Sequence, residues 1–593
     1  MRLALHTMLT IGVAARVLAA AEPSAAQHAH PQSYCNPLNL DYAYCPIPNF
    51  AAQGKHRATA DPAVVMFRGD YYLFSTNQWG YWWSPDMNVW NFVPRKFLRP
   101  EHKVYDELCA PAAFVIDDQL HVIGSTHTPD FPIWRSRAPK NVDVDRWEEA
   151  VASFAGSAWD PAFFLDDDGR LYLYHGSSND RPLYGQEVDR ESLQPIGPKR
   201  ELIRLDDERH GWERFGEAND NTFLRPFIEG AWMTKHDGRY YLQYAAPGTE
   251  FSGYGDGVYV GDRPLGPFKY QTHNPICFRP GGFARGAGHG STFQDRGGDY
   301  WRCATIVIGV KNNFERRLGM WPAAFDGEGV MHCDTAYGDY PQRLPDTETP
   351  SDAHGASLGW MLLNYAKPVT ASSSLGGFAP NLAVDEDIKT YWSAATGKPG
   401  EQFTSDLGAI SQIFAIQVNY ADQDAELLGK VAGLRHQYVI TASSDGETWN
   451  TIVDKSANQR DVPHDYVELA TPVEARFVRI ENRRVPSGKF ALSGLRVFGL
   501  GRGEPPHPVQ DFISLRGESE PRNAWLKWRQ SPDATGYVIR SGVDPQKLYN
   551  SVMVYGANEY YFRAMDRDVP YYFQIEAFNE NGVSAPTEPL LAK

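Results

Sequence analysis

The sequence predicts an all-β protein: a five-bladed β-propeller, then a jelly-roll β-sandwich, then an Ig-like sandwich. Three observations predict this fold. One hairpin pattern recurs five times before residue 345, no long helical periodicity separates the copies, and hydrophobic, charged and aromatic residues make up 42%, 22% and 13% of the chain, as in a globular protein rich in aromatic residues. A chain of 593 residues is also too long for one hydrophobic core, so several domains are expected.

Residues 1–26 have the pattern of a secretory signal peptide. Arg2 precedes an apolar stretch that ends in small residues, so we expect a secreted or periplasmic protein. His6 and Arg16 interrupt the apolar stretch, and the alternative is a leader with no targeting role. No later apolar run is long enough to cross a bilayer, which predicts that the chain has no membrane span.

The acidic balance of the chain limits its partners. The formal net charge is −16. A surface of this sign repels the phosphates of nucleic acids and of anionic lipids, so we expect neither as a general partner.

The six cysteines all lie within the first 333 residues, and none has the CxxC spacing of a zinc or thioredoxin-like site. In an exported protein some of them can pair, and Cys35 and Cys45 are close enough in sequence to do so. Buried free thiols are the equally acceptable alternative.

The recurring pattern lies within residues 35–345. Each copy opens on a small or polar residue, continues as a short apolar strand, turns on Asp or Gly and returns as a strand rich in Tyr, which is typical of a β-hairpin. Copies recurring about every 50 to 70 residues fit four-stranded sheets repeated around an axis. A β-sandwich with coincidental hairpins is the alternative, and the regular spacing disfavours it. The copies open at Asp61, Ala110, Asp160, Glu229 and His289.

These opening residues predict a site. The inner strands of a propeller converge on one axis, so Asp61, Asp160, Glu229 and His289 should form a ring at one end of the channel. Like charges held together raise at least one pKa, which provides a proton donor and an ionised base, the pair that cleaves a glycosidic bond. Taken singly, an Asp before Pro often only caps a turn, and His289 between glycines can be a packing residue.

Two further domains follow the propeller. Residues 363–500 contain short strands of alternating polarity and predict a β-sandwich or jelly roll. Residues 508–593 alternate strictly between apolar and polar positions and have the size of an Ig-like sandwich. Polar or proline-rich stretches precede both domains, as expected of linkers.

The propeller segment resembles glycoside hydrolase family 43. The resemblance is carried, in order, by ADPAVV, WDPAFFLDDDGRLYLY, FIEGAWMTKHDGRYYL and GAGHGS. It implies an inverting, exo-acting hydrolase of arabinofuranosides, xylosides or galactofuranosides, with Asp61 as general base, Glu229 as general acid, and Asp160 tuning the acid and orienting the sugar. The family usually has Glu-Gly-Pro at the acid, whereas this chain has Ala231 in place of the proline.

The same resemblance implies further site residues. Trp79 is expected to stack on a sugar face, with packing in the propeller core as its alternative, and Arg285 is expected to bind hydroxyls or the carboxylates. His289 is expected to assist substrate binding and to contact, through water, a structural calcium ion in the channel, because calcium prefers oxygen ligands. No organic cofactor is implied, and the expected partner is an oligo- or polysaccharide.

Residues 363–500 resemble the factor 5/8 type C (discoidin) domain, which overlaps carbohydrate-binding module family 32. Asp385 and Trp392 lie in the motifs that carry this resemblance. Residues 508–593 resemble a fibronectin type III domain through Trp528 and Tyr537, which implies a spacer.

Two other functions fit the same residues. One is a non-catalytic propeller that binds glycans, although a pure binder has no need of an acid and a base. The other is a retaining hydrolase similar to fructofuranosidases, which also use an Asp and a Glu.

Overall fold

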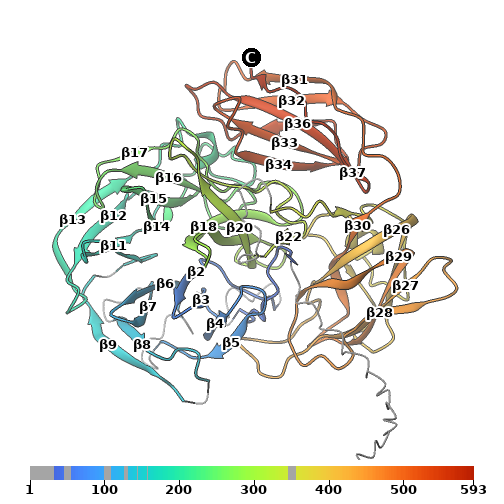
Figure 1. Ribbon diagram of the computed structural model, residues 1–593, viewed down its shortest axis with the longest axis horizontal. Helices are drawn as coiled ribbons and strands as arrows, with labels where there is room; N and C mark the ends of the chain where they lie inside the picture. The colour runs from blue at the N-terminus through green and yellow to red at the C-terminus, as the bar shows by residue number, and fades with distance from the viewer. Residues whose placement is uncertain are drawn as a thin grey trace, which may run out of the picture.

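The computed structural model describes residues 33–45, 55–98, 108–125, 131–142, 144–156, 158–344 and 356–593. The predicted signal peptide, residues 1–26, lies outside them. The described chain is almost entirely β-structure, with two short 3₁₀ helices, η1 (Gly211–Glu213) and η2 (Pro380–Ala383). The predicted all-β class is confirmed. Figure 1 shows the propeller, with the second domain beside the first blade and the third domain next to the fourth and fifth blades.

Five four-stranded antiparallel sheets form the five predicted blades, and in each sheet the strands follow the order of the chain. The blades are β2 (Ala63–Phe67), β3 (Asp70–Phe74), β4 (Gly80–Ser84) and β5 (Asn91–Pro94); β6 (Cys109–Ile116), β7 (Gln119–Ser125), β8 (Phe131–Ser136) and β9 (Trp147–Phe154); β10 (Ala162–Leu165), β11 (Leu171–His175), β12 (Leu183–Val188) and β13 (Pro195–Ile203); β14 (Glu229–His236), β15 (Arg239–Ala246), β16 (Gly255–Gly261) and β17 (Phe268–Tyr270); and β18 (Arg285–Gln294), β19 (Tyr300–Val307), β20 (Arg316–Phe325) and β21 (Met331–Cys333).

The inner strands form a closed ring. Strand β2 contacts β6 and β18, β10 contacts β6 and β14, and β14 contacts β18. The segments on either side of the blades are also joined, since β1 (Ser33–Tyr34) pairs with β22 (Gln342–Arg343). The five inner strands therefore surround one axis, as the repeat predicted.

Local sequence explains the hairpins. The turns between the first two strands of three blades consist of two residues with positive φ: Arg68-Gly69, Asp117-Asp118 and Asp237-Gly238. Two successive left-handed residues form a type I′ turn, whose twist matches that of the flanking strands, and Gly, Asp and Asn adopt that conformation most readily. The Asp and Gly residues between the apolar strands thus set the strand pairing.

The second domain is the predicted β-sandwich. Its main strand order is β23-β30-β26-β29-β27-β28, with β24 on β26 and β25 on β30. The long strands β26 and β29 are irregularly paired, with register shifts after Asp406 and Ile413. The strands are β23 (Met361–Leu362), β24 (Val369–Ala371), β25 (Trp392–Ser393), β26 (Gln402–Tyr420), β27 (Gln437–Ser443), β28 (Asn450–Asp454), β29 (His464–Arg484) and β30 (Ala491–Leu500).

The third domain has two sheets, as predicted. One has the order β31-β32-β35, and the other β34-β33-β36-β37, with β38 on β36. Its likeness to fibronectin type III stays a prediction. The strands are β31 (Gln510–Arg516), β32 (Ala524–Arg529), β33 (Gly536–Gly542), β34 (Asn550–Tyr555), β35 (Glu559–Phe562), β36 (Tyr572–Asn579), β37 (Gly582–Val583) and β38 (Leu590–Leu591).

The third domain is packed against the propeller instead of being a separate spacer. Trp212 and Tyr244 of the propeller belong to the same buried apolar cluster as Leu526 and Phe573 of the third domain. His210 Nδ1 and Asp566 Oδ1, both buried, lie 2.8 Å apart across this contact. Removal of so much apolar surface from water favours one fixed arrangement of the two domains.

No disulfide joins any of the six cysteines, all of which lie in the described parts of the chain. Cys35 and Cys45 are both buried and remain unbonded to each other. Of the two alternatives that the sequence left open, the structure has the buried thiols.

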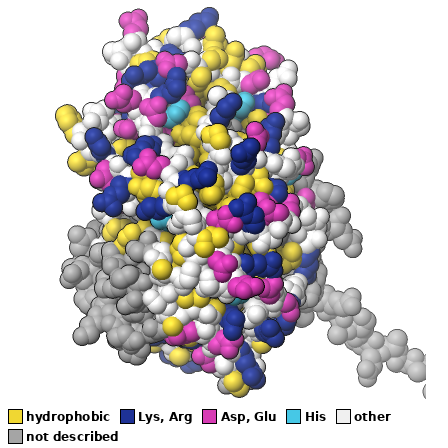
Figure 2. All heavy atoms as spheres, turned by 90° about the vertical axis from the view of Figure 1, so that its left-hand side faces the viewer, with side chains coloured by type: hydrophobic (Ala, Val, Ile, Leu, Met, Phe, Trp, Pro, Cys, Tyr) yellow, Lys and Arg dark blue, Asp and Glu magenta, His cyan; other side chains and the backbone are white. Residues whose placement is uncertain are grey.

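Among the described residues, no helix is long and apolar enough to cross a membrane. On the face of the molecule in Figure 2, basic and acidic side chains are interspersed. The net negative charge is therefore not gathered into one continuous acidic surface on this side.

Buried charges join the propeller to the second domain. Arg57, just before the first blade, has no exposed surface, and its Nε and Nη1 lie 2.9 and 2.6 Å from carboxylate oxygens of Asp422 and Asp461. Tyr44 adds a hydroxyl donated to Asp422 Oδ1 at 2.7 Å. The two carboxylates of the second domain thus share one buried cation of the first, and Asp461 also lies 3.1 Å from His436 Nδ1.

Replacing Arg57 with Ala is expected to destabilise this junction by about 3–5 kcal/mol, because it leaves two buried carboxylates without their cation. Urea denaturation followed by tryptophan fluorescence, together with limited proteolysis between residues 345 and 363, measures the effect. Arg68→Ala is the control, since its ion pair with Asp118 is exposed, and its denaturation midpoint should match that of the wild type. An unchanged midpoint for Arg57→Ala would show that the junction does not depend on this cation.

Candidate active site

In four blades, a residue just before or within the inner strand has an uncommon backbone conformation. Asp61, Ala110, Asp160 and His289 have φ values of 57°, 41°, 48° and 46°. Left-handed backbone is costly for residues other than glycine and is maintained only where the surrounding structure determines it. Four of the five predicted opening positions are thus structurally equivalent.

The fourth blade differs by one residue. Here the left-handed position, with φ 63°, is Gly230, and Glu229 comes one residue before it. A register shift follows in the pairing of β14 with β15, between Glu229 and Trp232. Gly230, and not Glu229 as predicted, is therefore equivalent to the other opening residues. Glu229 is the first residue of the inner strand β14.

His289 joins two of the carboxylates. Its Nδ1 lies 3.2 Å from Asp61 Oδ1 and 3.7 Å from Asp160 Oδ2. Burial lowers the pKa of His289, but Asp61, Asp160 and Glu229 outweigh burial, and the net effect is to raise that pKa above its usual value. The imidazole thus favours its protonated form and balances part of the negative charge.

Asp61 is fixed from two neighbouring blades. Thr76 donates its hydroxyl to Asp61 Oδ2 at 2.7 Å. The backbone N–H of Asp61 donates to Thr305 Oγ1 at 3.0 Å. With His289 at the other carboxylate oxygen, both oxygens of Asp61 have a partner.

Asp160 is a buried carboxyl group with a raised pKa. Burial raises the pKa of Asp160 to about 7, His289 opposes this, and the charges of Glu229 and Asp61 add to it. Ser125 donates to Asp160 Oδ1 at 3.3 Å, and the N–H of Gly230 donates to Oδ2 at 3.3 Å. The division of roles among the carboxylates stays a prediction.

Glu229 is held by two hydroxyl groups. Tyr254 donates to Glu229 Oε1 at 2.5 Å, and Ser177 donates to Oε2 at 2.9 Å. Tyr254 is fully buried, and burial together with the charges of Glu229 and Asp61 raises its pKa well above its usual value, so that Tyr254 remains a donor. Because the Gly230 N–H binds Asp160, Glu229 and Asp160 are neighbours at the same end of the channel.

The backbone of His289 is held by a buried ion pair between Asp256 and Arg302. The backbone N–H of His289 donates to Asp256 Oδ1 at 2.9 Å. Asp256 in turn lies 2.6 Å from Arg302 Nη2, and neither side chain has any exposed surface. This pair holds the backbone of β18 where the imidazole meets the carboxylates.

Arg316 is a buried cation near the site that no sequence motif predicted. Arg316, at the start of β20, is buried and donates to Thr249 Oγ1 at 2.6 Å, while its Nε has no hydrogen-bond partner among the described residues. Burial raises the pKa of Glu250, Glu229 adds to this effect and Arg316 opposes it, which places Arg316 at the edge of the carboxylate group. Nothing in the local sequence distinguishes Arg316 from other basic residues.

Trp79 and Arg285 lie at contacts with the second domain. A Cβ atom on Gly429 of the second domain would lie 2.4 Å from the Trp79 ring, and Lys96 Nζ is 3.5 Å from its centre. Arg285 Nη2 is 3.6 Å from Asp387 Oδ1, and its Nε donates to the carbonyl of Gly282. Neither residue has a hydrogen bond or ion pair with the catalytic carboxylates among the described residues, and their binding of substrate stays a prediction.

A calcium ion held in the channel by the described residues stays a prediction. They contain no group of three or more His, Cys, Asp or Glu side chains that could hold a metal ion. His289 Nδ1 faces two carboxylates that it neutralises, whereas calcium requires six to eight oxygen ligands. No chemical step is derived through calcium.

Comparison with known families agrees with the geometry. Residues 55–329 match the family model of glycosyl hydrolases family 43, and residues 368–493 match that of the F5/8 type C domain. The propeller is a glycosyl hydrolases family 43 domain. The domain after it is an F5/8 type C domain. Both predicted resemblances are confirmed at the level of the domain.

Curated relatives match over shorter segments. A beta-xylosidase of Xylanibacter ruminicola is 29% identical over 134 residues, 19% of this chain and 39% of the relative. A beta-D-galactofuranosidase of Aspergillus niger is 28% identical over 148 residues, with 25% and 37% covered, and an arabinoxylan arabinofuranohydrolase of Paenibacillus polymyxa is 33% identical over 140 residues, with 22% and 20% covered. The matches thus span less than half the length of each relative.

Solved structures similar to this chain include a glycoside hydrolase with 16% identity and a TM-score of 0.44, which covers 77% of this chain and 100% of its own. Another is a thermostable family-43 glycoside hydrolase with 21% identity and a TM-score of 0.41, covering 49% and 97%.

Asp160→Asn is expected to change how stability depends on pH. Folding raises the pKa of Asp160 from 3.8 to about 7, so between these values the folded protein holds a proton that the unfolded chain releases. Asp160 therefore lowers the stability of the wild type as pH rises from about 4 to about 7. The Asn side chain does not titrate, so the variant does not lose this stability. The melting temperature of the variant minus that of the wild type should increase from pH 4 to 7 and then level off.

Asp168→Asn is the matched control, since Asp168 lies in the exposed turn of the same blade. Its melting temperature should follow that of the wild type at every pH. A constant difference between Asp160→Asn and the wild type across the window would mean that Asp160 is ionised throughout.

Proposed function

We propose that this protein is an exported, exo-acting glycoside hydrolase that removes a terminal xylosyl, arabinofuranosyl or galactofuranosyl residue from an oligo- or polysaccharide with inversion. The proposal is supported by the contacts of His289, whose Nδ1 faces both Asp61 and Asp160. Glu229 lies beside Asp160, which accepts a hydrogen bond from the N–H of Gly230. The curated relatives named above act on these three sugars. The pattern of residues 1–26 supports export.

Asp61 has the environment of the base. Its carboxylate accepts a hydrogen bond from Thr76 and faces His289. In an inverting reaction this carboxylate takes a proton from water as the water oxygen bonds to the anomeric carbon. The proton remains on Asp61 until it is released to solvent.

Glu229 has the environment of the acid. It delivers its proton to the glycosidic oxygen as the bond from that oxygen to the anomeric carbon breaks. The hydroxyl of Ser177 can rotate to accept from a protonated Oε2, while Tyr254 continues to donate to Oε1. After the proton leaves, both hydroxyls donate to the carboxylate and stabilise the product state.

Asp160 positions and balances the site. Its raised pKa favours the neutral form more than in a free aspartic acid, and the neutral carboxyl group can donate a hydrogen bond to a sugar hydroxyl. The N–H of Gly230 binds Asp160 and connects it to the strand that carries the acid.

Glu229→Gln is expected to lower kcat by about 10²–10⁴-fold on a glycoside with a poor leaving group, because the leaving oxygen then departs without its proton. The loss should be much smaller on an aryl glycoside with an activated leaving group, which needs no acid. Asp61→Asn should lower kcat on both kinds of substrate, and Asp168→Asn should leave it unchanged. A screen of aryl xyloside, arabinofuranoside and galactofuranoside with these variants makes the measurement.

If Glu229→Gln hydrolyses the poor substrate as fast as the wild type, the assignment of the acid is wrong. If the wild type hydrolyses none of the three glycosides but binds glycans, the propeller is a binding module.

The product of a single turnover should have the opposite anomeric configuration to the substrate, because water attacks from the face opposite the leaving group. Proton NMR during the first minutes of hydrolysis, before mutarotation, detects which anomer forms first. Initial formation of the anomer with retained configuration would make one of the carboxylates a nucleophile and favour the fructofuranosidase-like alternative.

A further inference from the structure

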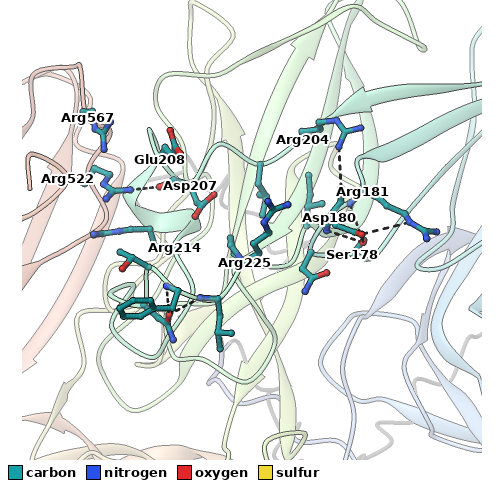
Figure 3. Close-up of a pocket in the computed structure, with 18 residues that line it drawn as sticks. Ser178, Asp180, Arg181, Arg204, Asp207, Glu208, Arg214, Arg225, Arg522 and Arg567 are labelled. Atoms are coloured by element: carbon teal, nitrogen blue, oxygen red, sulfur yellow. Dashed lines mark hydrogen bonds and ion pairs between the residues drawn. The ribbon is translucent and has the colours of Figure 1, made fainter.

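A groove lies beside the segment that precedes Glu229. It has a volume of about 730 Å³ and lies between the third blade, the segment that leads into the fourth blade, and the third domain. Figure 3 shows its charged side chains coming from both walls, with Arg225 between them in this view. Its lining includes charged side chains and the exposed Phe223 and Leu224.

The groove begins next to Glu229. Ser178 and Ile228, which line it, pair through backbone hydrogen bonds of 3.1 and 2.9 Å. The residue before Ser178 and the residue after Ile228 are Ser177 and Glu229, which are hydrogen-bonded to each other at 2.9 Å. The acid of a glycosidase lies on the side of the leaving group. The part of the substrate beyond the cleaved bond is therefore directed towards this groove.

The groove is positively charged although the chain is acidic. Six arginines and three carboxylates line it, in a protein with a formal net charge of −16. The arginines are Arg181, Arg204, Arg214, Arg225, Arg522 and Arg567, and the acids are Asp180, Asp207 and Glu208. A surface this rich in guanidinium groups attracts anions.

Some of these arginines are already occupied. Arg522 Nε donates to Glu520 at 2.7 Å, Arg214 Nη2 donates to Asn523 at 2.6 Å, and Arg204 Nη2 donates to Glu201 at 3.0 Å. These three support the walls and are held by protein partners.

Three other arginines are available. Arg225 and Arg567 are exposed, and among the described residues the guanidinium of neither makes a hydrogen bond or an ion pair. Arg181 is 74% exposed, and its ion pair with Asp180 is long, with 3.8 Å between Arg181 Nε and Asp180 Oδ1. They come from three parts of the chain: the β11–β12 loop, the segment before β14 and the third domain. Their convergence on one groove depends on the packing of the third domain.

An apolar surface accompanies the charges. Phe223 is 95% exposed and Leu224 is 56% exposed. Asn221 Oδ1 accepts from the N–H groups of both residues, at 2.9 and 3.0 Å, which fixes the turn that presents them. An exposed aromatic ring beside polar groups suits the face of a sugar.

We propose that this groove binds the leaving-group portion of an acidic glycan, with Arg225, Arg567 and Arg181 contacting the carboxylates of uronic acid residues. The inference rests on the proposed hydrolase function and names the class of its substrate. The planar guanidinium matches a carboxylate with two parallel hydrogen bonds, which gives both affinity and selectivity over neutral sugars. The third domain thereby supplies part of the substrate-binding surface through Arg567.

The test measures binding without turnover. In the full-length protein carrying Asp61→Asn, trigalacturonic acid and its methyl ester are titrated by calorimetry at low and high salt. The free acid is expected to bind at least about ten-fold more tightly than the ester at low salt, and added salt should reduce this difference. Adding Arg225→Gln and Arg567→Gln together should abolish the preference, and Arg225→Lys alone should keep only part of it.

Arg200→Gln is the matched control. Arg200 is an exposed arginine of β13 that does not line the groove, so its replacement should leave the preference unchanged. The three substituted arginines are all exposed, and thermal melting verifies that each variant is folded.

Equal affinity for acid and ester, or a preference that persists in the double variant, would overturn the inference. Failure of the proposed function is seen separately, as the inability of the wild type to hydrolyse any of the neutral aryl glycosides. An acid preference in a protein without that activity would assign the groove to a binding module, and would overturn the role of the groove in a leaving-group site.

Discussion

The candidate site depends on a backbone constraint that repeats around the channel. In four blades a residue just before or within the inner strand is in the left-handed region, and in the remaining blade Gly230 takes that position. This conformation is unfavourable for Asp and His in isolation, so the surrounding contacts must maintain it. Hydroxyl groups of Thr76, Thr305 and Ser125 satisfy the polar groups of Asp61 and Asp160 at these turns. The catalytic groups thus meet because the blades repeat one local geometry.

Much of this arrangement could be predicted from the sequence, because hairpins and their turns are local. The alternation of apolar strands with Asp- and Gly-containing turns gave the number of blades, and the opening residues gave the three carboxylates and His289. The offset in the fourth blade was missed, since Glu229 and Gly230 are adjacent and only strand pairing distinguishes their positions. Arg316 was missed because its importance comes from burial near Glu250 and Glu229 and not from a motif.

Contacts between domains were the least predictable part, because they join residues hundreds of positions apart. Trp79 and Arg285 resemble substrate-binding side chains in type, yet the structure places them against Gly429 and Asp387 of the second domain. The third domain was expected to be a spacer, but its core is continuous with that of the propeller. Such packing follows from the complementarity of whole surfaces, which no single stretch of sequence displays.

The pairing of β1 with β22 joins the two ends of the propeller segment. Ser33 is the first residue of that pair, and its hydroxyl also lies 2.7 Å from the hydroxyl of Tyr466 in the second domain. Asn36, three residues later, receives and donates hydrogen bonds at Met320 in the fifth blade. Loss of Ser33 and Tyr34 would therefore remove both the pairing between the two ends of the ring and a contact with the second domain.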